Sequence, residues 1–96
     1  MEILGKNFKV NYGLRAMFVF EQITERPFAV NGLMDEYILF YSCIVSVKDN
    51  PALDFEEFID YCNDHPELLE DFGKYLQDEL KKKDAFDKKK VVKEQN

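Results

Sequence analysis

The segment from residue 34 to residue 47 constrains the fold more than any other part of this chain, because almost every residue in it is apolar. Its longest apolar run, residues 37–47, contains only two serines. A membrane span needs about 20 apolar residues, so this run is too short to be one. It is typical of a helix at the centre of a protein core, with a single narrow polar stripe made by Asp35, Ser42 and Ser46.

A chain of 96 residues has room for one domain around such a helix. Hydrophobic residues make up 46% of it and charged residues 33%, which is the composition of a globular protein and not of a disordered one. Four glycines and three prolines favour helices over a turn-rich β-sandwich. Residues 2–10 alternate weakly around a Gly-Lys-Asn turn signal, which predicts a strand, a hairpin or an extended arm.

Local stop and start signals divide the first half of the chain into two helices. The first covers residues 14–24 and ends before Pro27, because the residue that precedes a proline avoids the α region. It is apolar on most sides, so it lies in the core or is covered by a partner. The second is the central helix, which begins at Asn31 or Gly32 and extends to about Val47.

Two further helices follow in the second half. Asp54 and Glu57 form a capping-box-like start of a third helix. Pro66 suits the first position of a fourth helix, whose apolar stripe lies within residues 68–80. The sequence therefore predicts a mostly α fold, a small bundle of about four helices with a short N-terminal extended or β segment.

The charge is distributed unevenly along the chain. Residues 1–80 contain six Lys and Arg against 16 Asp and Glu, whereas residues 81–96 contain seven lysines against three acids. We expect a helical domain with an N-terminal extended arm over residues 1–80 and a lysine-rich, charged C-terminal extension over residues 81–96. An acidic body repels nucleic acids and anionic membranes. Nucleic-acid binding through the lysines is therefore the weakest of three functional hypotheses.

The residues that usually carry catalysis or bind metals are scarce and lack the required spacing. Cys43, Cys62 and His65 form no zinc or catalytic pattern. A calcium loop before the third helix would place Lys48 at a ligand position and Pro51 at the turn that needs glycine. The acids of the last two helices lie on outer, solvated faces. The sequence predicts no enzyme, no metal site and no cofactor.

Aromatic residues are the remaining surplus, with nine phenylalanines and five tyrosines. Four short helices have difficulty in hiding all of them, and exposed aromatics often anchor protein–protein contacts. The alternative is a dense aromatic core with tyrosine hydroxyls at its rim. Tyr61 belongs to the surplus, and the candidate partner-binding residues are Phe18, Phe20, Phe28, Tyr37, Phe40, Tyr41 and Tyr75.

A series of short motifs extends over about residues 3–80. They are, in order, Gly5-Lys6-Asn7-Phe8, Tyr12-Gly13-Leu14-Arg15-Ala16, Phe20-Glu21-Gln22-Ile23-Thr24 and Leu53-Asp54-Phe55-Glu56-Glu57-Phe58 before an acidic last helix. This order resembles the small tail assembly chaperones of long-tailed bacteriophages and prophages. The family-like positions are Arg15, Ala16, Glu21 and Thr24.

The resemblance implies a function that the composition leaves open. Such chaperones are small, acidic and mostly helical, and they bind the long hydrophobic tape-measure protein while tail-tube subunits polymerise around it. They are absent from the mature virion. The first hypothesis is therefore a non-enzymatic assembly chaperone that binds a hydrophobic helical client. The N-terminus lacks the pattern of a secretory signal, so we expect the cytoplasm of the bacterial host.

The second hypothesis uses the same aromatic residues differently. A small structural or adaptor domain would bury them by forming a homo-oligomer. Isolation of a long helical client would favour the chaperone, whereas a discrete dimer without a client would favour self-association.

Overall fold

The computed structural model describes the backbone of residues 1–95 and the side chains of residues 1–82. The elements are β1 (Glu2–Ile3), β2 (Lys6–Asn7), α1 (Leu14–Thr24), α2 (Leu33–Val45), α3 (Phe55–Asp64) and α4 (Glu67–Gln95). Over this range the protein is mostly α, with four helices and one small two-stranded sheet. The predicted fold class is confirmed, and the bounds of the first helix coincide with the predicted ones.

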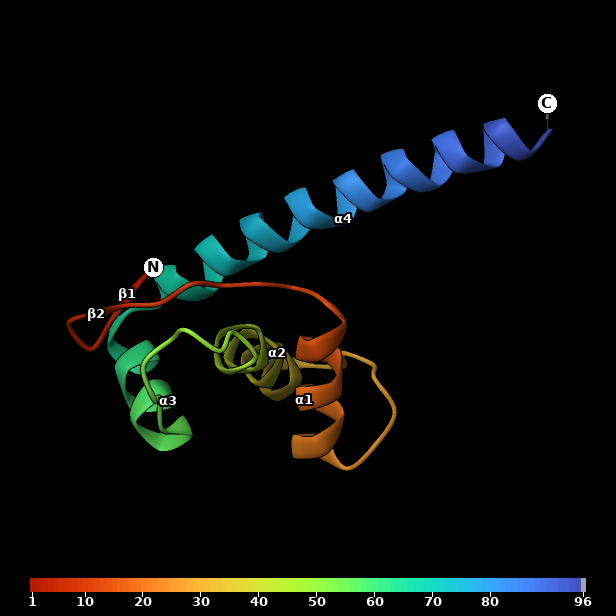
Figure 1. Cartoon of the computed structure of the whole chain (residues 1–96). Coiled ribbons are helices and arrows are strands. Elements are labelled where there is room, and N and C mark those ends of the chain that lie inside the picture. The colour runs from red at the N-terminus through yellow and green to blue at the C-terminus, as the bar shows by residue number, and fades with distance from the viewer. Residues whose placement is uncertain (96) are drawn as a thin grey trace.

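The N-terminal segment forms a hairpin followed by an extended arm. Strands β1 and β2 pair antiparallel, with Ile3 opposite Lys6. Leu4 and Gly5 make the turn and have φ values of 55° and 74°, as the two central residues of a type I′ turn require. Ile3 and Phe8 are buried, so the hairpin contributes to the core. Residues 8–13 then cross the molecule to the start of α1 (Figure 1).

Helix α2 occupies the centre of the molecule. Figure 1 shows α1 and α3 on opposite sides of it and α4 across a third side, and α2 contacts all three. The buried apolar residues of α2 are spread around the helix and are Ile38, Leu39, Phe40, Cys43 and Ile44. This confirms the predicted central helix. It ends at Val45, two residues early, where Ser46 caps it and Val47 N–H donates to the carbonyl oxygen of Ile44.

The polar stripe of α2 is buried instead of facing solvent. Asp35, Ser42 and Ser46 are 4%, 0% and 8% exposed. Asp35 pairs with Arg26, which follows α1, and Ser46 borders a hollow that α1 also lines, so the stripe lies on the α1 side. Ser42 Oγ donates to the carbonyl oxygen of Ile38 at 2.7 Å. The hydrogen-bonding requirement of this buried hydroxyl is therefore met within the helix, as is common for serine in a helix.

Helices α3 and α4 complete the core on the other sides of α2. Asp54 Oδ2 accepts a hydrogen bond from Glu57 N–H at 3.1 Å, which confirms the predicted start of the third helix. Pro66 lies just before the first residue of α4 and not in its first turn, because His65 and Pro66 form the connection. Phe72 of α4 is buried against the centre of the molecule.

Helix α4 continues past the predicted domain boundary to Gln95 without a break in the helix. Figure 1 shows its second half extending beyond the other helices. The lysine-rich extension predicted over residues 81–96 therefore follows on the same helix. Most of its side chains lie outside the part that the structure describes, and the boundary at residue 80 stays a prediction.

Candidate partner-binding site

Two of the seven predicted contact aromatics are core residues. Phe20 and Phe40 are both 0% exposed. The ring of Phe40 stacks on Phe72 at a centroid distance of 4.6 Å and meets Phe58 edge-on at 5.0 Å, while Phe20 meets Phe28 edge-on at 5.1 Å. We therefore correct the prediction for Phe20 and Phe40, because their inward helix positions leave no surface for a partner.

Two tyrosines lie at the rim of this core with their hydroxyls occupied. Tyr41 is half-buried and its hydroxyl donates to the carbonyl oxygen of Leu53 at 2.6 Å. The Tyr75 hydroxyl accepts from Tyr12 N–H at 2.8 Å and so fastens α4 to the N-terminal arm. Burial raises the pKa of both phenols. These two tyrosines therefore fit the alternative to a partner surface, which was an aromatic core with tyrosine hydroxyls at its rim. Tyr61, also half-buried, stacks on His65.

The other three aromatics each line a different hollow. Phe28 borders a pocket of about 370 Å³ between α2 and α4, here called the α4 pocket. Phe18 lies in a hollow of about 610 Å³ between α1 and the end of α2, the α1 groove. Tyr37 lies in a hollow of about 390 Å³ between α2 and α3, the α2–α3 groove. The predicted aromatic surface is therefore divided among three sites.

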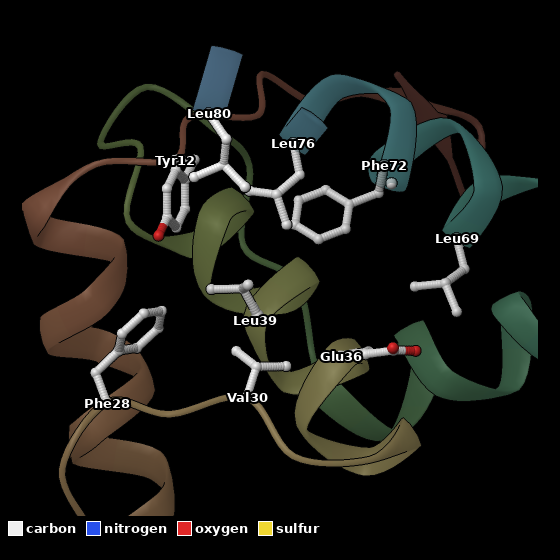
Figure 2. Close-up of a pocket in the computed structure, with 10 residues that line it drawn as sticks. Tyr12, Phe28, Val30, Glu36, Leu39, Leu69, Phe72, Leu76 and Leu80 are labelled. Carbon is white, nitrogen blue, oxygen red and sulfur yellow. The ribbon is translucent and has the colours of Figure 1, made fainter. Parts of the chain in front are cut away.

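The α4 pocket is shown in Figure 2. Leu76 and Leu80 of α4 lie on one side of it, Leu39 of α2 lies in the middle, and Phe28 and Val30 lie on the opposite side. These last two residues belong to the connection between α1 and α2. The pocket therefore lies between residues 76–80 of α4 and that connection. Its shape depends on the contacts that hold the connection in place.

Three of the four family-like positions shape α1 and this connection. Ala16 is 1% exposed where α1 packs on α2, which its small side chain permits. Glu21 Oε2 accepts from Phe28 N–H at 2.7 Å, and Thr24 Oγ1 donates to the carbonyl oxygen of Phe20 at 2.9 Å. These roles are structural. Arg15 differs, because it is exposed and lines the α1 groove.

An ion pair that the sequence pattern does not predict holds the end of the same connection. Arg26 pairs with the buried carboxylate of Asp35 and also donates to the carbonyl oxygen of Ala29 at 3.2 Å. The Asn31 N–H donates to Asp35 Oδ2 at 2.8 Å. This backbone hydrogen bond, with help from Arg26 and against the effect of burial, lowers the pKa of Asp35 below its ordinary value of 3.8. The signal in the sequence for this ion pair was the position of Asp35 within an almost wholly apolar helix, where a carboxylate needs a partner.

The α1 groove combines apolar and cationic side chains. Leu14 is 65% exposed and Phe18 is 54% exposed, one helical turn apart on α1. Arg15 and Lys48 lie beside them. Ser46 also borders the groove, and its buried Oγ has no hydrogen-bond partner within the described part of the chain. This surface therefore has basic charge next to its apolar residues.

The α2–α3 groove is the most apolar of the three hollows. Its lining residues are all apolar or aromatic and are Leu33, Met34, Tyr37, Ile38, Phe55 and Ile59. Met34 is 75% exposed and Leu33 is 64% exposed. Neither residue is predicted from the sequence to be at the surface, because the apolar pattern places the whole helix in the core. Their place in the first turn, directly after Gly32, was the only signal that they lie at an end.

Reactive groups are few among the residues that the structure describes. Burial raises the pKa of the Cys43 thiol to about 12 and that of Cys62 to about 11, so both thiols stay protonated at neutral pH and are poor nucleophiles. Over the same residues, no three His, Cys, Asp or Glu side chains gather as metal ligands would. Nor does any helix there combine the length and apolarity of a membrane span.

Comparison of the chain with models of protein families, with curated proteins and with solved structures finds no match, so the resemblance to tail assembly chaperones stays a prediction.

Proposed function

We propose that this protein is a non-enzymatic assembly chaperone that binds an apolar helical segment of a client protein in the α2–α3 groove. The observation that supports this function is the pair Leu33 and Met34, which are largely exposed at the mouth of an apolar groove. Small proteins seldom leave adjacent large apolar side chains in water, and such patches often mark interaction sites.

The shape and chemistry of the groove suit a helix better than a polar ligand. Two helices line it, and an amphipathic helix binds such a surface through apolar residues at i, i+3, i+4 and i+7. Met34 adds adaptability, since its unbranched side chain fits clients of different shape. The α4 pocket is a weaker candidate, because its most exposed apolar residues, Leu80 and Val30, reach only 44% and 38%.

The charge of the body suits a chaperone. Its 16 acidic residues against six basic ones would keep a complex with an apolar client in solution. The family resemblance supports the identity of the client, the tape-measure protein of a phage tail, with tail-tube subunits as further partners. On this proposal the protein acts in the cytoplasm of the bacterial host and is not retained in the mature virion.

A co-purification experiment tests the proposal. The tagged chain is co-expressed with its native neighbouring genes, as the wild type and as a Leu33→Ser/Met34→Ser variant. The expected result is a long helical client that the wild type retains and the variant loses. The matched control is Leu14→Ser/Phe18→Ser, which removes two exposed apolar residues from α1 and keeps the client. Recovery of the wild-type chain alone would contradict the proposal.

Self-association is the second candidate function. The observation in its favour is that one chain has both an acidic body and a lysine-rich C-terminal segment, so two copies offer complementary charges. Sedimentation velocity over a hundredfold range of concentration distinguishes the two functions. A stable dimer that dissociates at high salt would favour self-association through these charges, whereas a monomer favours a client.

A further inference from the structure

We propose that the helix bound in the α2–α3 groove carries lysine or arginine along the border of its apolar stripe that faces α3. This inference rests on the proposed function and names the chemical class of its partner. It comes from the distribution of charge around the α2–α3 groove, which differs from that around the α1 groove.

The two helices that line the groove contain acids and no cations. Helices α2 (Leu33–Val45) and α3 (Phe55–Asp64) together contain six Asp and Glu and no Lys or Arg. A helix that binds between them therefore meets negative charge alone on these two elements. Basic residues in that partner would be attracted to the site and acidic ones repelled.

The acidic charge is concentrated on the α3 side of the groove. Phe55 and Ile59 line the groove, and the residue that follows each of them is an exposed acid, Glu56 and Asp60. These two acids are one helical turn apart, so they form a short row beside the apolar lining. On α2, by contrast, Asp35 is already neutralised by Arg26 and buried.

The second acid of α2 does not belong to this groove. Glu36 lines the α4 pocket, which lies on another side of the helix. The partner therefore needs its cations on one border of the stripe, the border next to α3. A helix with lysines on both borders would gain little from the second row.

The α1 groove provides the contrast within the same molecule. There the exposed apolar residues Leu14 and Phe18 lie beside Arg15 and Lys48. A cation-bordered helix is repelled at that surface and attracted at the α2–α3 groove. Charge therefore favours binding of such a helix at the α2–α3 groove over binding at the α1 groove.

The inference is tested by the binding of two designed peptides to the full chain. Both are amphipathic helices with the same leucine stripe, and one has lysines along one border where the other has glutamates. Binding is measured by fluorescence anisotropy at low salt and at 0.5 M salt. We expect the lysine peptide to bind about tenfold more tightly at low salt, from two exposed charge pairs. The difference shrinks at high salt because exposed charges are screened.

Two matched variants separate local attraction from the general effect of an acidic protein. Glu56→Gln/Asp60→Asn removes the row beside the groove and is expected to abolish the preference for the lysine peptide. Glu57→Gln/Asp64→Asn makes the same change of charge on α3, about half a helical turn away from the groove, and is expected to keep it. Equal losses in both variants would overturn the inference, since the attraction would then be diffuse. Circular dichroism confirms that each variant is folded.

Other outcomes distinguish this inference from the function on which it rests. If both peptides bind equally and Leu33→Ser/Met34→Ser abolishes both, the charge rule is wrong and the groove still binds helices. If neither peptide binds, or if binding survives in that variant, the proposed function is wrong as well. A chain that forms a dimer through the groove and excludes both peptides would identify a second copy as the occupant and overturn both proposals.

Discussion

Each end of helix α2 has a pair of adjacent apolar residues, and the two pairs have opposite environments. At the last end, Cys43 and Ile44 are 0% exposed. At the first end, Leu33 and Met34 are 64% and 75% exposed. The difference teaches that hydrophobicity specifies how much of a helix would gain from burial, whereas the connections around it decide which end is covered.

The N-terminal arm covers the last end of α2. Asn50 Oδ1 accepts from Lys9 N–H, and Asn50 Nδ2 donates to the carbonyl oxygens of Lys9 and Ile44, all at 2.7–2.8 Å. Asn11 N–H donates to the carbonyl oxygen of Cys43 at 2.9 Å. These hydrogen bonds hold the arm across the end of the helix. At the first end, Asp35 pairs with Arg26 and accepts from Asn31 N–H, and the neighbouring Leu33 and Met34 stay exposed.

The largest expected effect contrasts a core residue of α2 with one of its first turn. Phe40→Ala should lower the free energy of unfolding by about 3–5 kcal/mol, because it leaves a cavity between the rings of Phe58 and Phe72. Met34→Ser should change it by less than about 0.5 kcal/mol, as exposed substitutions do. Urea denaturation followed by circular dichroism measures both. Similar losses in the two variants would mean that Met34 is covered in solution.

The second prediction concerns the arm that covers the last end. Asn50→Ala removes three hydrogen bonds between the arm, the end of α2 and the following loop, and should cost about 2 kcal/mol. The control is Asn31→Ala at the other end, where the hydrogen bond to Asp35 uses the backbone N–H and survives. Denaturation midpoints compare them. Equal midpoints would show that the side-chain hydrogen bonds of Asn50 contribute nothing to the stability of this end.

A smaller change, in the opposite direction, is expected at the buried polar stripe. Ser46→Ala removes a buried hydroxyl that has no partner among the described residues, and should raise the free energy of unfolding by about 1 kcal/mol. Ser42→Ala is the matched control, because the Ser42 hydroxyl already donates to Ile38 and its loss brings no such gain. Thermal unfolding distinguishes them. A destabilised Ser46→Ala variant would reveal a partner for the hydroxyl.

The smallest expected effect is the pH dependence of stability that comes from Asp35, whose carboxylate holds the first end of α2. The pKa of Asp35 is lower in the folded protein than the ordinary 3.8, so the stability from this carboxylate is present above that value and is lost as the pH falls through the folded pKa. Asp35→Asn should therefore be less stable than the wild type at pH 6. The difference in stability between this variant and the wild type should become smaller as the pH is lowered toward 2.5. A series of urea midpoints between pH 6 and pH 2.5 measures it.

The exposed carboxylate of Asp64 provides the reference for that series. Asp64 is the last residue of α3, and its carboxylate forms no salt bridge within the described part of the chain. The Asp64→Asn variant removes this carboxylate. Its midpoints should follow those of the wild type across the whole range. If Asp35→Asn behaves in the same way, the ion pair with Arg26 does not stabilise the first end.

Much of the fold could be predicted because its signals are local. The bounds of the first helix follow from the start of its apolar pattern and from Pro27, and the third helix begins where Asp54 caps it. The partner surface depended on longer-range information. Phe18 and Phe20 are two residues apart on a helix that is apolar on most sides, yet one is 54% exposed and the other 0%. No local pattern separates them, because α2 decides which side of α1 is covered.

The sequence by itself determined the four helices, the central place of α2 and the excess of acids, because periodicity, caps and charge are properties of neighbouring residues. Only the tertiary structure decided that the polar stripe is buried while Leu33 and Met34 face solvent. The physical reason is that Arg26, which is nine residues from Asp35, compensates the buried carboxylate. The arm and the neighbouring helices have enough surface to cover most of α2, and Leu33 and Met34 of its first turn remain exposed.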